Sequence, residues 1–234
     1  MPKLSFLSAL FLFSCCFGFA QKPPAADAII ARYVKMIGGE KQWAAIKTSE
    51  FHATATIGDK ALIMLIIKAG SGKLYQSMEG GNLSITEIYD SGSAIVLQNG
   101  KPRKITDTIM LDHYQLQSNI LPDMSYIKLQ YNRQVSGLEN INGVPCYKVI
   151  LTSKNGSVNT NYYEQKSGLL TMIEKSGVKT YLSDYKFYKG CSIPFSMSTD
   201  SGNGYSMKIK LTEWLINQKS SVELFNTKKQ EAGL

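Results

Sequence analysis

The sequence contains few of the residues from which catalytic and metal sites are built. Its two histidines, His52 and His113, lie far apart in the chain and have no metal-ligand spacing. It has no nucleophile elbow, phosphate-binding loop or zinc-protease motif. The acidic residues Glu87, Asp184 and Glu213 stand alone rather than in acid–base pairs. These absences argue against an enzyme, and they predict no cofactor and no bound metal.

Cysteine is also scarce, and no apolar run after residue 20 is long enough to span a bilayer. Two of the four cysteines, Cys15 and Cys16, lie in the N-terminal apolar segment, which leaves Cys146 and Cys191. A disulfide between these two would suit an exported protein. Both also lie in apolar strand contexts, where a free buried thiol is ordinary. The sequence leaves the two alternatives open.

The first twenty residues have the pattern of a signal peptide. Lys3 supplies a positive charge, Leu4 to Phe19 is apolar and uncharged, and Ala20 is a small residue at the cleavage position. We therefore expect a signal peptide over residues 1–20 and one exported, periplasmic domain over residues 21–234. The alternative is a lipoprotein signal that tethers the protein to a membrane through Cys15.

The positive charge of the chain is spread along its length. Removing Lys3 with the signal peptide lowers the formal net charge from +8 to +7. The one small basic cluster, residues 100–104, is expected in a solvated turn between strands. Such a balance suits peripheral contact with an acidic membrane surface, whereas scattered charge does not favour binding of nucleic acid.

Hydrophobic periodicity predicts two helices. Near the N-terminus, Asp27 can cap a helix with an apolar face at spacings of three and four residues, and a glycine pair ends it. The second is expected from Asp107 to Leu121, with Pro122 ending it. The apolar face of this second helix consists of Ile109, Met110, Tyr114, Leu116 and Ile120.

Most of the remaining chain alternates with a period of two, which predicts β strands separated by Asn-Gly and Ser-Gly turns. The segment Ala61 to Ile67 is apolar on both faces and should therefore be covered on both sides. About ten strands are more than a flat layer carries well, so we expect a curled antiparallel sheet whose mouth the second helix could close. The expected strands cover residues 48–57, 61–67, 73–78, 83–89, 94–98, 145–152, 160–165, 169–175, 179–188, 193–199 and 205–216.

Several segments together carry a family resemblance: residues 26–33 with the following Ile37-Gly38-Gly39, residues 163–170, Asp184-Tyr185, residues 190–194 and Glu223-Leu224-Phe225. In this pattern the chain resembles the LolA-like and LolB-like superfamily of periplasmic lipoprotein carriers, particularly its outer-membrane lipoprotein-sorting relatives in Bacteroidetes. The resemblance implies a mainly β fold with two helices, in which an unclosed β barrel has a helical lid. It also implies that the concave side shelters acyl chains or other apolar ligands.

An apolar cavity in such a sheet would be lined by side chains that the alternation and the helix face direct inward. Tyr181, Tyr185 and Phe187 are expected to share one face of their strand. The alternative is that these side chains simply fill the core, as in most small barrels. The candidate lining residues are Leu62, Met64, Ile66, Met110, Tyr114, Tyr185, Phe187 and Met207.

Two functions follow from these expectations. The first is a non-catalytic periplasmic carrier or binding protein for lipid, lipoprotein acyl chains or another apolar ligand. The alternative is a cell-envelope interaction or accessory domain that binds another protein by a face or edge of its sheet and has no small-molecule ligand.

Overall fold

The computed structural model describes residues 23–70, 72–219 and 222–227. The predicted signal peptide and its alternative lipid attachment site at Cys15 lie outside these residues. Within them, no helix is long and apolar enough to cross a membrane. The helices are α1 (Ala26–Met36), α2 (Glu40–Ala45), α3 (Thr108–Gln117) and the short 3-10 helices η1 (Pro122–Met124) and η2 (Val222–Phe225).

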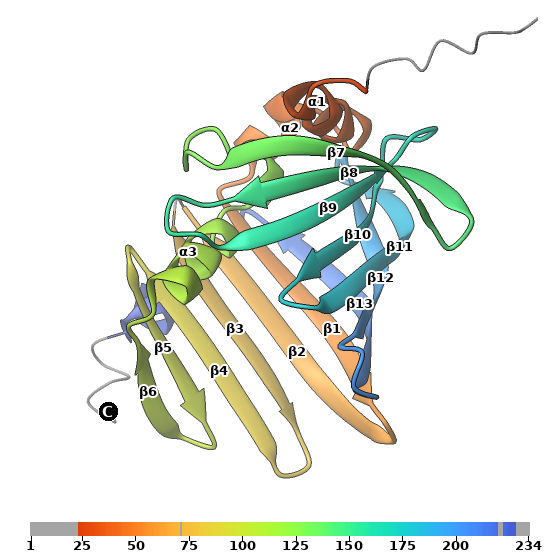
Figure 1. Cartoon of the computed structure of the whole chain (residues 1–234). Coiled ribbons are helices and arrows are strands. Elements are labelled where there is room, and N and C mark those ends of the chain that lie inside the picture. Colours follow the sequence, from red (N-terminus) through yellow and green to blue (C-terminus); the bar gives the residue numbers. More distant parts are fainter. Residues whose placement is uncertain (1–22, 71, 220–221, 228–234) are drawn as a thin grey trace, which may run out of the picture.

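The strands form one curled antiparallel sheet (Figure 1). Its first half contains β1 (Thr48–Ile57), β2 (Lys60–Ala69), β3 (Lys73–Gly80), β4 (Leu83–Asp90), β5 (Ser93–Gln98) and β6 (Lys101–Ile105). Its second half contains β7 (Asn132–Ile141), β8 (Val144–Thr152), β9 (Val158–Glu164), β10 (Leu170–Lys175), β11 (Val178–Tyr188), β12 (Cys191–Asp200) and β13 (Ser206–Ile216).

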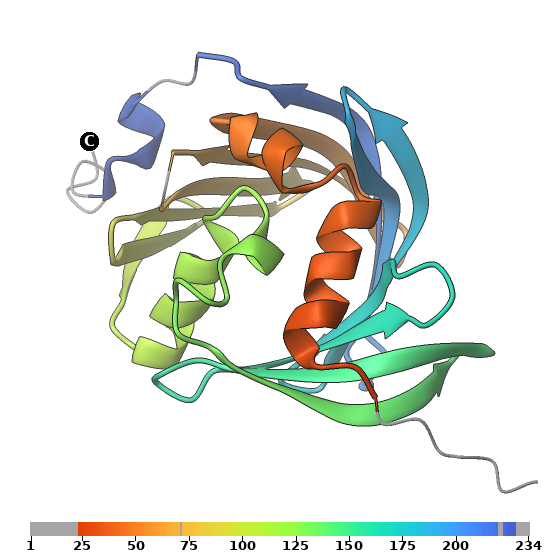
Figure 2. The same cartoon turned by 90° about the horizontal axis from the view of Figure 1, so that it is seen from above.

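The order of the strands explains why the barrel stays open. Consecutive strands pair with one another except for β6 and β7, and β1 also pairs with β13, which joins the two halves. β6 and β7 are consequently the two edges of the sheet. The connection between them, residues 106–131, carries α3 and η1 across the concave side, where α1 and α2 also lie (Figure 2). The predicted unclosed, mainly β architecture with a helical lid is confirmed.

Both edge strands were missing from the sequence prediction. β6 covers most of the basic cluster that was expected in a turn, and four of its five residues are exposed. Pro102 is tolerated there because an edge strand need not use every backbone N–H in the ladder. β7 is likewise exposed along one side. Edge strands bury few side chains, so their sequences show little apolar alternation.

Local hydrogen bonds set the ends of the helices. Asp107 caps α3 as predicted, accepting a hydrogen bond of 2.8 Å from the backbone N–H of Met110. The helix ends at Gln117 rather than Leu121, because the side chain of Asn119 donates to the carbonyls of the last turn. α1 begins one residue before Asp27, so this carboxylate lies in its first turn and is not its cap.

Aromatic packing fills the part of the barrel under α1 and α2. Trp214 of β13 stacks on Phe51 with ring centroids 5.7 Å apart. The ring centroid of Trp43 in α2 lies 5.8 Å from that of Trp214. The indole N–H of Trp214 donates to the hydroxyl of Ser49 at 2.8 Å. Buried aromatic groups with satisfied N–H donors contribute strongly to a core. The aromatic rings therefore pack this end of the barrel as part of the main hydrophobic core.

Two predictions about strand faces were wrong. The first was that Tyr181 and Tyr185 share a face of β11. Tyr181 packs with the small cluster around Cys146, whereas Tyr185 packs against the main core. Between them Asp184 has a φ of 54° and is absent from the pairing with β12, which interrupts the alternation. On β2, Ile63 is 70% exposed, so the predicted cover on both faces does not extend to this residue.

Candidate functional site

The concave side of the sheet contains a cavity of about 640 Å³, called the main cavity below. α1, α3 and η1 contribute to one side of it, and strands from both halves of the sheet form the rest. Its volume falls within the roughly 300–1,000 Å³ typical of small-molecule sites. Its apolar wall includes Leu74, Leu116, Leu170, Ile173, Leu182 and Met197.

Contacts from the middle of α3 hold this helix over the main cavity. Asp112 accepts hydrogen bonds from Ser153 and Asn155 in the β8–β9 loop, the second at 3.0 Å. Tyr114 stacks on Tyr89 of β4 with ring centroids 6.4 Å apart. The lid is therefore attached to both halves of the sheet through side chains.

A buried polar group lies where η1 meets the sheet. Tyr163 donates a hydrogen bond of 2.5 Å to Asp123, and Asn161 donates to the hydroxyls of Tyr163 and Tyr126 at 3.0 and 3.1 Å. Burial raises the pKa of Asp123 to about 6, although the bond from Tyr163 and the charge of Lys68 act in the opposite direction. A carboxylate with such a pKa is ionised at neutral pH at a cost to the fold.

Lys68 of β2 is the cation nearest this group. Its side chain is only 8% exposed, and its ammonium donates to the backbone carbonyl of Asn119 at 3.0 Å. Burial lowers the pKa of Lys68 to about 8, and the charge of Asp123 partly offsets this shift. Lys68 thus has a carbonyl and a carboxylate to compensate its buried charge.

A second set of polar side chains lines the main cavity near the end of β10. Burial lowers the pKa of Lys175 to about 8 and that of His113 in α3 to about 4, the latter with a smaller contribution from Lys175. On β4, burial raises the pKa of Glu87, which a hydrogen bond from Tyr114 partly offsets. No group of three or more possible metal ligands occurs among the described residues.

One of the eight predicted lining residues, Tyr114, lies in the wall of the main cavity. Leu62 and Met64 are buried in the main hydrophobic core. Three others, Ile66, Tyr185 and Met207, are partly buried and pack against that core. None of these five side chains lies in the wall of the main cavity, to which β3, β4 and β9–β12 contribute.

The remaining two predicted residues are exposed, Met110 at 38% and Phe187 at 76%. α3 buries Tyr114 against β3–β6 and Leu116 in the main core, and Met110 belongs to neither cluster. Phe187 lies near the end of β11, where none of the described elements covers it.

The sequence did not identify Lys68, Asp123 or Lys175 as cavity residues. The available signal for Lys68 was its position directly after the apolar run of β2. Asp123 and Lys175 border turns, where a polar residue ordinarily faces water.

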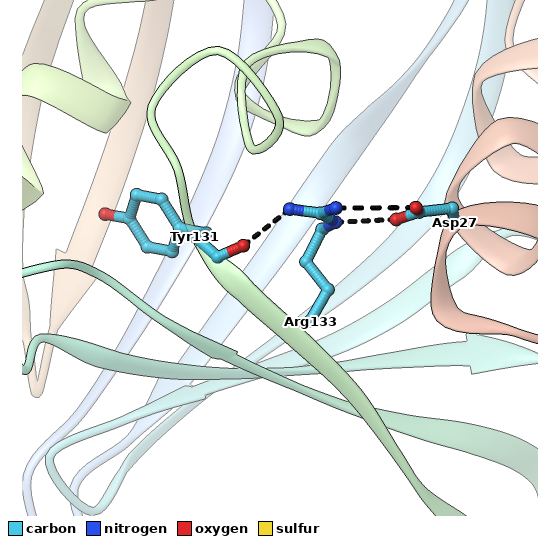
Figure 3. Close-up of polar contacts among 3 residues, drawn as sticks. All are labelled: Asp27, Tyr131 and Arg133. Atoms are coloured by element: carbon cyan, nitrogen blue, oxygen red, sulfur yellow. Dashed lines mark hydrogen bonds and ion pairs between the residues drawn. The ribbon is translucent and has the colours of Figure 1, made fainter.

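A second cavity of about 390 Å³ lies beside α1 and shares Asp123 and Tyr126 with the main cavity as wall residues. Beside it, Arg133 of β7 donates to Asp27 of α1 at 2.6 Å and to the carbonyl of Tyr131 at 2.5 Å (Figure 3). The bond from Arg133 holds the pKa of Asp27 below its usual range. α1 is thereby fastened to an edge strand.

Cys146 and Cys191 are buried free thiols. Cys146 packs with Tyr162 and Met172, whereas Cys191 belongs to the main core. Three strands, β9 to β11, separate the strands that carry them. Neighbouring strands lie about 4.8 Å apart, so this separation explains the absence of a disulfide.

Neither the protein-family models nor the curated proteins contain a match to this sequence. Solved structures do match. A LolA superfamily protein from Nitrosomonas europaea aligns at 9% identity with a TM-score of 0.59, over 88% of this chain and 100% of that one. An outer membrane lipoprotein-sorting protein domain from Vibrio parahaemolyticus also aligns at 9% identity with a TM-score of 0.59, over 88% of this chain and 98% of that one.

A DUF1329 family protein from Desulfovibrio piger aligns at 14% identity with a TM-score of 0.58, over 89% of this chain and 100% of that one. Identities this low establish the fold and no more. The curled sheet, its two open edges and the helices on its concave side show that this chain has the LolA-like fold.

Proposed function

We propose that this protein is a non-catalytic carrier or binding protein of the cell envelope, with a lipid, a lipoprotein acyl chain or another apolar molecule as its ligand. The observation that carries the proposal is the main cavity, which combines apolar walls from both halves of the sheet with a helical lid. Sheltering an acyl chain there would be favourable by about 0.8 kcal/mol for each methylene removed from water.

The contacts of the lid support reversible access to the main cavity. α3 is held by side-chain hydrogen bonds and ring stacking, and it shares no backbone ladder with the sheet. It could therefore move aside while every strand pairing stays intact. Movements of lids held in this way occur within microseconds to milliseconds in many proteins.

Export to the periplasm belongs to the same proposal. A cleaved signal peptide would leave a mature chain that begins at Gln21, and mass analysis of the N-terminus of protein from the envelope fraction tests this. Lipid on Cys15 would instead make the carrier membrane-tethered.

Binding is tested with a fluorescent fatty-acid probe and with native mass spectrometry of protein purified from its own envelope. Leu182→Glu places a charge in the apolar wall and should weaken probe binding strongly, because a dry site disfavours charge. Ile63→Glu is the matched control, since Ile63 lies on a strand of the same sheet but is 70% exposed. Equal binding by both variants, with the circular-dichroism spectrum unchanged, would contradict the carrier proposal.

The second candidate function is binding of another envelope protein through an edge of the sheet. The supporting observation is that β6 and β7 each pair with a single strand, and Leu138 of β7 is 55% exposed. An open edge can accept an added strand from a partner. A photo-crosslinker placed at Leu138 that captures one envelope protein, together with no bound lipid, would favour this function over the carrier.

A further inference from the structure

Lys175 ends β10 and lines the main cavity, and its ammonium has no acidic partner among the residues that the structure describes. The adjacent Glu174 instead accepts a hydrogen bond of 3.2 Å from Tyr162. On α3, Asp112 is already bonded to Asn155 and the β8–β9 loop. Burial alone accounts for the lowered pKa of Lys175, which means that no nearby anion compensates its charge.

His113 also lines the main cavity and carries a second polar group without a partner. Its Nδ1 is buried and has no hydrogen-bond partner. With a pKa of about 4, its ring is neutral at neutral pH, and a neutral imidazole can carry its proton on Nδ1 and donate it. Buried polar atoms are rarely left unpaired in folded proteins, so the unpaired Nδ1 of His113, beside a lysine without an acidic partner, points to a missing acceptor.

These two groups lie where the main cavity reaches solvent. Ser176, in the turn after Lys175, is exposed and also lines the cavity. Behind it, the wall continues with Ile173 and Leu182, which are apolar. The cavity thus has polar donors at an opening and an apolar stretch of wall beside them, while the buried charges of Lys68 and Asp123, elsewhere in the wall, already have partners within the protein. Polar donors next to an apolar wall are the arrangement that an amphiphile requires.

Lys68 differs from Lys175 in having its partners within the protein. It donates to the carbonyl of Asn119 and interacts with the charge of Asp123. An incoming anion would gain less from Lys68, whose charge is already compensated.

We propose that the ligand is an amphiphile with an anionic headgroup, a carboxylate or a phosphate, which Lys175 and His113 bind at the opening while the chain lies inside the main cavity. This inference rests on the proposed carrier function and narrows its ligand class. The bonds involved are charge-assisted at Lys175, where an ammonium meets an anionic oxygen.

Isothermal titration calorimetry with the full mature chain tests the inference, using dodecanoate, dodecyl phosphate and dodecanol below their micelle concentrations. The two anionic compounds should bind about tenfold or more tightly than the alcohol, since a hydrogen bond to a charged group is worth about that factor. Lys175→Met should remove this advantage and leave dodecanol binding unchanged, and Lys175→Arg should retain it. Lys179→Met is the matched control, because Lys179 is exposed on the next strand and does not line the cavity.

The outcomes separate this inference from the proposed function. Dodecanol binding as tightly as dodecanoate, with no effect of Lys175→Met, would overturn the headgroup assignment and leave the carrier proposal standing. Acetate or inorganic phosphate binding as tightly as the amphiphiles would mean an anion site that needs no chain, and would overturn the assignment as well. If none of the compounds binds, both proposals fail.

Discussion

Replacing Asp123 by asparagine should stabilise the protein at neutral pH. The carboxylate is buried and accepts a hydrogen bond from Tyr163, and asparagine can offer an oxygen at the same place. Burial raises the pKa of Asp123 from 3.8 to about 6. The folded state therefore holds the proton more tightly than the unfolded state does. The contribution of this group is most favourable below about pH 4, is lost as pH rises, and is fully lost above about pH 6.

The size of the effect follows from the shift. About two pKa units at 1.36 kcal/mol each amount to roughly 3 kcal/mol of native-state cost at neutral pH. The substitution also removes a negative charge near Lys68, whose own burial is partly compensated by Asp123. The net gain should therefore be smaller, about 1–3 kcal/mol, in line with other replacements of buried ionic groups.

Urea unfolding followed by tryptophan fluorescence measures this directly, because Trp43 and Trp214 both lie in the core. The quantity to follow is the difference in unfolding free energy between Asp123→Asn and wild type, which should grow between about pH 4 and about pH 6 and then level off. Asp59→Asn, in the exposed β1–β2 turn, should show no such trend. A difference that stays flat with pH, or a variant less stable than wild type only at neutral pH, would refute the reasoning.

Three further predictions concern packing. Gly38→Ala should lower the unfolding free energy by at least ~2 kcal/mol, since the new Cβ would lie 2.4 Å from a backbone oxygen. Gly81→Ala is the control, because open space surrounds Gly81, and it should cost only about 1 kcal/mol. Similar losses for both variants in urea unfolding would contradict this prediction. Trp214→Phe should lower the unfolding free energy by about 2–4 kcal/mol. The substitution leaves the buried hydroxyl of Ser49 without its hydrogen-bond donor and creates a void beside the stacked rings. A smaller loss would mean that the core relaxes around the new side chain. Burial raises the pKa of Cys146 and Cys191, so both thiols should resist alkylation in the native protein and react fully in urea without reductant; protection that persists in urea would indicate a disulfide.

The fold was largely predictable because the interior strands carry strong periodicity. Strands such as β1 and β8 bury one face, and the residues of that face recur in the sequence as apolar residues at alternate positions. The edges β6 and β7 bury little, so their pairing could be inferred only from the strands beside them. α3 ends early because the side chain of Asn119 donates to a carbonyl of the last turn in place of a backbone N–H. Hydrophobic periodicity does not reveal such a hydrogen bond.

The candidate site was much less predictable. The alternation on β2 predicted that Leu62 and Met64 point inward, and both are buried in the main core. Alternation gives no information on whether the space inside the sheet is filled by side chains or left as a cavity. That depends on where α1, α2 and α3 pack, which is a matter of tertiary contacts. Lys175 and Asp123 became cavity residues through the same contacts, and neither position has a local pattern that marks it as buried.

The pairing of β1 with β13 has a consequence for how the protein folds. Every other strand pairing joins neighbours in sequence, but Ile57 of β1 pairs with Met207 of β13, 207 − 57 = 150 positions later. Closing a loop of that length costs roughly 4 kcal/mol of chain entropy before any contact compensates it. The two half-sheets can each assemble from local hairpins, whereas their union must wait for this encounter. We expect the β1–β13 seam to be the slow step of folding, so that substitutions along it reduce the folding rate while those in the β3–β4 hairpin mainly speed unfolding.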